Sequence, residues 1–161
     1  MLNVLMESVV TQERMHPVVI GDLVKQKQLY TEYDAEYGSH VLDEDALLEE
    51  LEPLSRNPDK GLILEYHSGD LFPSEWIDAV FVLRTDNTVL YDRLVSRGYE
   101  GKKLQDNIEC EIFQTILDEA REAFGNVIEL KSDCLQDMES NSNTIRDFIQ
   151  NWITQQSAST D

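Results

Sequence analysis

Two short, continuous apolar runs constrain the fold of this chain more than any other feature. They are Leu62-Ile63-Leu64 and Ala79-Val80-Phe81-Val82-Leu83. Polar residues do not alternate with the apolar ones inside either run, which is typical of parallel strands that are buried on both faces. The runs therefore predict an α/β fold, in which helices flank both faces of a parallel sheet.

Strand and helix patterns alternate along the rest of the chain, without repeats or obvious linkers. Helices are indicated by apolar residues that fall on one side and by capping residues at their starts. The further elements predicted in this way are strands at 18–20 and 127–130, and helices at 43–54, after Asp86 and at 144–155.

Length and composition set the class of protein. A chain of 161 residues, of which 41% are hydrophobic, predicts one globular domain, here residues 1–156, followed by a frayed tail at 157–161. No apolar run approaches the length of about 18 residues that spans a bilayer, so no membrane partner is expected. Two cysteines fit a reducing compartment, and Cys110 is expected to be buried in a helix.

A basic loop with two glycines follows the helix predicted after Asp86. It carries Arg97, Lys102 and Lys103, three of the 13 basic residues of the chain. Arginine and lysine supply charge for a phosphate, while glycine lets the backbone close over a ligand. Asp106 is the predicted N-cap of a helix. The apolar face of that helix is predicted to comprise Ile108, Ile112, Ile116 and Leu117.

Several motifs, in this order, resemble the adenylate kinase isoenzyme 6 family, small nucleoside monophosphate kinases linked to ribosome assembly. The similar segments are Gly21-Asp22-Leu23, Gln28-Leu29-Tyr30, Tyr33-Asp34, Glu36-Tyr37, 41–45, 61–67 with Asp70, Phe72-Pro73, 81–86, 90–94 and 96–114. The resemblance covers most of the chain, from about residue 16 to about residue 153. It implies a P-loop-kinase-like sheet, an acceptor-binding segment at about 19–42 and a LID loop at about 96–106.

The resemblance also implies catalytic residues. Arg97 corresponds to the LID arginine that closes on phosphate, with Lys102 and Lys103 as auxiliary charge. Glu65 and His67 correspond to an acidic residue and a histidine at the end of a buried strand. There a carboxylate holds Mg²⁺ through water, and the histidine orients a water or the acceptor. The family usually has Asp where this chain has Glu65, and the longer side chain would move the carboxylate.

Four further residues are implied to bind substrate. Gly21 would let the backbone approach the ligand closely, and Asp22 begins the acceptor segment. Leu42 and Arg84 complete the set. Arg84 would face phosphate from a strand end, although an ion pair explains an arginine there equally well. Tyr30, Tyr33 and Tyr37 could stack on a ligand or pack at the surface.

The phosphate loop of the family, G-x-x-x-x-G-K-[ST], has no counterpart in this sequence. The glycines are at positions 21, 38, 61, 69, 98, 101 and 125, so none precedes Gly21 and none has that spacing. In such loops the backbone cradles phosphates, the lysine reaches the β/γ-phosphates and the hydroxyl holds Mg²⁺. The first strand and phosphate loop are therefore predicted to be altered or missing, with Leu2–Met6 as the one candidate for the central strand.

Three interpretations of function stay open. In the first, the chain is an adenylate kinase-type phosphotransferase that converts ATP and AMP to two ADP with Mg²⁺, hydrolyses ATP slowly, and acts in the nucleus and cytoplasm in maturation of 18S rRNA and the small ribosomal subunit. Without the loop, its activity is expected to be weak or absent. In another interpretation, the sequence is a truncated isoform or gene model of that kinase.

In the remaining interpretation, the chain is a non-catalytic acidic module that binds a basic small-subunit ribosomal protein. The formal net charge of −19 fits such a partner and disfavours direct contact with DNA or anionic membranes. Solubility alone explains the same charge, and composition by itself favours that simpler explanation.

Overall fold

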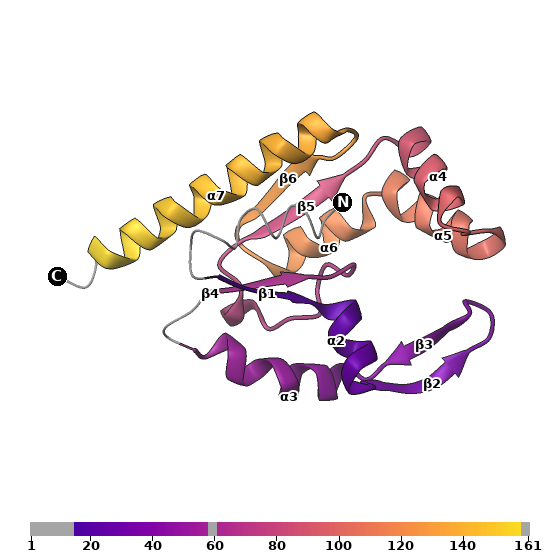
Figure 1. Cartoon of the computed structure of the whole chain (residues 1–161), viewed down its shortest axis with the longest axis horizontal. Coiled ribbons are helices and arrows are strands. Elements are labelled where there is room, and N and C mark those ends of the chain that lie inside the picture. The colour runs from indigo at the N-terminus through magenta and orange to yellow at the C-terminus, as the bar shows by residue number, and fades with distance from the viewer. Residues whose placement is uncertain (1–14, 58–60, 159–161) are drawn as a thin grey trace.

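The computed structural model describes residues 15–57 and 61–158 (Figure 1). Strand β1 (Met15–Val19) pairs in parallel with β4 (Gly61–Glu65), and β5 (Val80–Arg84) pairs in parallel with β6 (Val127–Lys131). Both apolar runs lie in these strands, apart from Ala79, which immediately precedes β5. The predicted α/β fold with parallel strands is confirmed.

Six α-helices and one short 3₁₀ helix belong to the described part of the chain. They are α2 (Ile20–Lys27), α3 (Glu44–Ser55), η1 (Ser74–Trp76), α4 (Asn87–Ser96), α5 (Gly101–Ile112), α6 (Thr115–Ala123) and α7 (Leu135–Ala158). Asp86 caps α4 as predicted, and Asp43, the predicted first residue of its helix, is the N-cap of α3. The Asp43 carboxylate accepts from the Ala46 N–H at 3.0 Å, which satisfies a donor that has no partner inside the helix.

Helices cover both faces of the strands. Leu47 and Leu51 of α3 are fully buried in a cluster with residues of β1 and β4, and Leu117 of α6 packs near Val82 of β5. The cluster around Ile145 and Ile149 of α7 is contacted by both Ile63 and Phe81. Because Ile63 lies in β4 and Phe81 in β5, α7 spans the two strand pairs and joins them into one layered unit (Figure 1).

The pairing of the strands is relevant to the predicted central strand. Among residues 15–57 and 61–158, β4 pairs only with β1 and β5 only with β6. The candidate for the central strand, Leu2–Met6, lies outside the described residues.

The predicted strand at 18–20 is wrong at its carboxyl end. Ile20 is the first residue of α2, so Gly21 and Asp22 lie in the first turn of a helix and not in a loop. Ile20 is also fully buried. A short apolar run cannot reveal where a buried strand becomes a buried helix, because both present apolar side chains.

Asp106 is not the N-cap of α5. The helix begins five residues earlier, at Gly101, whose φ of +54° favours glycine, and Glu100 occupies the N-cap position. The last part of the predicted LID loop is therefore helical. The predicted apolar face of this helix is also interrupted, because Gln114 has a φ of +58° and α6 starts at Thr115. Cys110 is exposed, not buried.

Helix α7 begins at Leu135, nine residues before the predicted start. Its first turn is held by Asp137, whose carboxylate accepts from the backbone N–H groups of Asp133 and Cys134. Polar residues early in the helix hide it from an apolar periodicity. The helix ends at Ala158, so it includes two residues of the predicted frayed tail, and 159–161 lie outside the described residues. No helix in the described ranges is long and apolar enough to cross a bilayer.

Candidate functional site

The carboxyl ends of β1 and β4 bring the first group of predicted site residues together. Val19, the last residue of β1, is the register partner of Glu65, the last residue of β4. Because α2 starts immediately after β1, Gly21 and Asp22 lie beside Glu65. In α/β proteins ligands bind beyond the carboxyl ends of the parallel strands. The acceptor segment and the strand-end carboxylate therefore share one edge.

Glu65 is the electrostatically unusual residue of this edge. Its Oε2 atom is buried and has no hydrogen-bond partner among the described residues. Burial, and then the negative charge of Asp22, raise the pKa of Glu65 above its ordinary value. A buried carboxylate oxygen without a donor is unfavourable. A donor or cation brought by a ligand would relieve both the burial and the repulsion.

His67 follows Glu65 by two residues, after β4 has ended. Its ring lies 4.4 Å from the Tyr66 ring, measured between centroids. His67 is exposed, yet desolvation by its neighbours lowers its pKa, so the imidazole is neutral near pH 7. The loop that carries it runs close to α6. A Cβ on Gly69 would stand 2.7 Å from the Ile116 carbonyl oxygen, so only glycine allows this approach.

The acceptor segment continues into a hairpin. Strand β2 (Tyr30–Asp34) pairs in antiparallel fashion with β3 (Ser39–Leu42), and the turn between them points to the right in Figure 1. The Leu42 side chain, predicted to bind substrate, packs against the buried cluster of α3 and β1. That packing anchors the base of the hairpin.

Arg97 lies between α4 and α5, where its backbone N–H caps α4 by donating to the Leu94 carbonyl at 3.0 Å. Its side chain is exposed and makes no hydrogen bond or ion pair with any residue of the described ranges. Lys102 and Lys103 lie in the first turn of α5 and both contact the hairpin turn. Lys102 and Lys103 thus bring the start of α5 against the turn between β2 and β3, and α5 lies beside this hairpin in Figure 1.

Arg84 does not meet these residues. Its Nε donates to Glu111 Oε1 at 2.6 Å, and its Nη2 donates to the Glu111 carbonyl oxygen at 3.2 Å. Nη1 lies 3.5 Å from the Glu129 carboxylate. The ion-pair interpretation therefore describes Arg84 in this structure. The sequence offers no sign of its partner, since Glu111 lies 27 residues away within an ordinary helical pattern.

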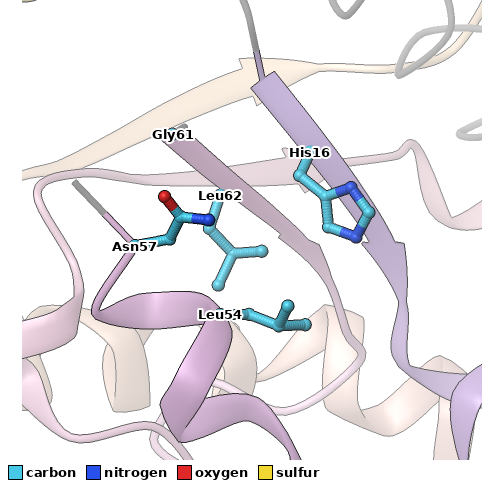
Figure 2. Close-up of a pocket in the computed structure, with 5 residues that line it drawn as sticks. All are labelled: His16, Leu54, Asn57, Gly61 and Leu62. Carbon is cyan, nitrogen blue, oxygen red and sulfur yellow. The ribbon is translucent and has the colours of Figure 1, made fainter. Parts of the chain in front are cut away.

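A small cavity of about 100 Å³ lies elsewhere, at the amino ends of β1 and β4 (Figure 2). It is lined by His16, Leu54, Asn57, Gly61 and Leu62. None of the predicted site residues lines it, and it is at the opposite end of these strands from Glu65. It therefore takes no part in the candidate site.

Comparisons with known proteins show the family of this chain. A family model described as an AAA domain matches residues 3–114. The chain is 40% identical over 150 residues to an adenylate kinase isoenzyme 6 homolog of Drosophila melanogaster, covering 92% of this chain and 85% of the relative. The homolog of Dictyostelium discoideum is 40% identical over 146 residues, covering 89% and 82%. The homolog of Schizosaccharomyces pombe is 41% identical over 150 residues, covering 92% and 85%. The chain belongs to the adenylate kinase isoenzyme 6 family.

Proposed function

We propose that this chain binds a nucleoside monophosphate at the edge formed by β1 and β4 and closes the basic residues of the LID on its phosphate. The observation that carries this proposal is the register of Val19 with Glu65, which places the acceptor segment against the strand-end carboxylate. The reaction of the proposed site is the adenylate kinase type, transfer of the γ-phosphoryl group of ATP to AMP, which this chain is expected to perform weakly or not at all without the phosphate loop. Such catalysis consists mainly of positioning and charge stabilisation.

Each residue has a separate task in this proposal. The unpartnered guanidinium of Arg97 binds the transferring phosphoryl group, because its planar fork matches phosphate oxygens and stays charged. Lys102 and Lys103 add positive charge from the start of α5. His67, neutral near pH 7, donates or accepts one hydrogen bond to orient water or the acceptor. Asp22 and the backbone at Gly21 border the acceptor.

Magnesium is proposed as the cofactor that accompanies ATP. No group of three or more His, Cys, Asp or Glu residues that could hold a metal ion occurs within the described residues. Mg²⁺ does not need such a cage, since it is usually held by one or two carboxylates, waters and the phosphates of the nucleotide. Glu65, with its unpartnered oxygen, and neighbouring Asp22 fit that donor set. When bound, the ion would neutralise phosphate charge.

Preference for AMP over ATP tests the proposal. The acceptor edge is present in the described structure, whereas the sequence contains no G-x-x-x-x-G-K-[ST] loop to cradle a triphosphate. AMP is expected to bind at least about tenfold more tightly than ATP with Mg²⁺, since each charged hydrogen bond lost is worth about 1.5–3 kcal/mol. Isothermal titration calorimetry with each nucleotide measures the two dissociation constants.

The matched control is Asp22→Asn, which keeps the size of the side chain but removes the charge beside Glu65. Asp22→Asn should change the dissociation constant for AMP, because Asp22 borders the proposed acceptor site. The protein should stay folded, because Asp22 is exposed. Tight ATP binding together with undetectable AMP binding would refute the proposal.

We also propose a role in small ribosomal subunit and 18S rRNA maturation, in the nucleus and cytoplasm, through a basic small-subunit ribosomal protein. The net charge of −19 supports this second function. Binding to a purified protein of this class should weaken steeply between 0.1 and about 0.5 M salt, because screening shortens the range of charge attraction. Binding that is absent at low salt, or indifferent to salt, contradicts this role.

A further inference from the structure

The turn of the acceptor hairpin touches α5 through residues far apart in the sequence. The Tyr37 hydroxyl donates to Asp106 Oδ2 at 2.7 Å, across 69 positions. Lys102 Nζ pairs with Glu36 Oε1 at 2.7 Å, and Lys103 Nζ donates to the Tyr37 carbonyl oxygen at 3.3 Å. Lys102 also lies over the Tyr37 ring, 5.0 Å from its centroid. Tyr37 therefore takes part in three of the four contacts.

Hydrogen bonds within the hairpin turn orient the Glu36 and Tyr37 side chains. Asp34 Oδ1 accepts from the backbone N–H groups of Glu36 and Tyr37, at 2.8 and 3.2 Å. Gly38 follows with a φ of +59°, a conformation that favours glycine. This Asp-capped turn sets the direction in which the Glu36 and Tyr37 side chains leave the hairpin.

The hairpin needs a contact at its tip. Strands β2 and β3 form a two-stranded sheet of their own, and their register shifts between Tyr30 and Tyr33. Isolated two-stranded hairpins are marginally stable in water. Leu42 anchors the base of the hairpin in the core, but the far end is held by its contacts with α5. Those contacts decide how close the hairpin stays to the LID residues.

The contacts differ in strength. The Lys102–Glu36 pair is exposed, with 52% and 63% of the side-chain areas accessible, and such pairs contribute little to stability. The Tyr37–Asp106 bond is part-buried and charge-assisted, a stronger class of hydrogen bond. Hydrogen bonding to Asp106 also raises the pKa of Tyr37, which keeps the phenol protonated as a donor. Lys102 can thus exchange Glu36 for a phosphate while Tyr37 holds the hairpin in place.

We propose that Tyr37 is a positioning residue, which locks the acceptor hairpin to α5 through Asp106 and so holds Lys102 and Lys103 over the acceptor segment. Its role in nucleotide binding rests on the proposed function. The contact itself can be measured without any nucleotide, so the two can fail separately.

Distances between two spin labels in the full chain test the contact. Cys110→Ser leaves native Cys134, which is exposed at the start of α7, and Ala35→Cys places the second label in the hairpin turn. In this background Tyr37→Phe is expected to shift the ratio of closed to open hairpin by at least about tenfold, the effect of one charge-assisted hydrogen bond. Tyr33→Phe, on the same hairpin and 59% exposed, should leave the distances unchanged.

Variants of the acceptor distinguish this bond from general loosening. Asp106→Ala should resemble Tyr37→Phe, and the double variant should be no more open than either single one, because both remove the same bond. Asp106→Asn keeps an acceptor oxygen without the charge and should restore part of the closed population. An unchanged distance distribution in Tyr37→Phe, or an equal shift in Tyr33→Phe, overturns the proposal.

A calorimetric titration with AMP decides what the contact is for. The dissociation constant in Tyr37→Phe should rise in proportion to the loss of the closed state. If the hairpin opens but AMP affinity is unchanged, the positioning role is overturned while the proposed function survives. If the unmodified chain binds no AMP, the proposed function fails, and the label distances still decide the contact.

Discussion

Supplying a phosphate loop is expected to raise transfer of phosphoryl from ATP to AMP by a factor of at least about 10³ over the unmodified chain. The graft replaces residues 1–14 with a strand, a G-x-x-x-x-G-K-[ST] loop and a helix. It would add several backbone donors, a lysine and a hydroxyl ligand for Mg²⁺ at once. Single donors in comparable roles are worth about 10²–10³ in rate, and such effects do not simply add. Coupled measurement of ADP production provides the rates.

Arg97→Ala in the grafted protein is the matched control. Activity should fall about 10²- to 10³-fold, because a guanidinium that stabilises phosphoryl charge is lost. Stability should not change, since the Arg97 side chain is exposed and has no partner among the described residues. Robust activity of the unmodified chain would show that its own first residues supply a donor site. A folded but inactive graft would favour the binding-module interpretation.

Glu111→Ala is expected to lower the free energy of unfolding by about 2–3 kcal/mol. Glu111 and Arg84 expose only 17% and 19% of their side chains. The same Glu111 oxygen also accepts from the Thr85 backbone N–H at 3.2 Å. Removing one partner of a buried pair costs about 3–5 kcal/mol, and partial exposure reduces that value. Urea denaturation followed by circular dichroism measures the difference.

Glu109→Ala is the control from the same helix, because the Glu109 carboxylate accepts an exposed hydrogen bond from Gln105. It should stay within about 0.5 kcal/mol of the unmodified chain. The double variant Arg84→Met with Glu111→Leu should recover most of the loss, since no charge is then left unpaired. A double variant as unstable as the sum of its single variants would contradict this account.

The resemblance named site residues that are spread from position 21 to position 103, and the structure brings some of them together but not others. Glu65 and Asp22 are brought together through the β1–β4 register, and Lys102 and Lys103 through the hairpin. Their roles in binding and catalysis stay predictions. Arg84 is instead engaged by Glu111, a residue that no local pattern marks. The sequence predicts that Tyr37 stacks or packs and that Asp106 caps a helix, whereas the structure pairs these two residues with each other.

Local features of the sequence determined the strands and several helix ends. An uninterrupted apolar run reports burial on both faces, and Asp43 and Asp86 satisfy backbone donors within three residues of themselves. The same sequence did not reveal where α2 begins, because a buried Ile20 suits either a strand or a helix, nor where α5 begins, because an exposed glycine such as Gly101 also suits a loop. There the burial of Ile20 and the positive φ of Gly101 are the deciding features.

Only the tertiary structure decided which distant residues meet. The pairing of Val19 with Glu65, of Arg84 with Glu111 and of Tyr37 with Asp106 depends on strand register and on where α5 lies against β5 and the hairpin turn. Neither is encoded within a window of a few residues, since each follows from packing the helices against both strand pairs. The sequence by itself therefore determined the chemistry available to this protein, and the fold decided which of those groups act together.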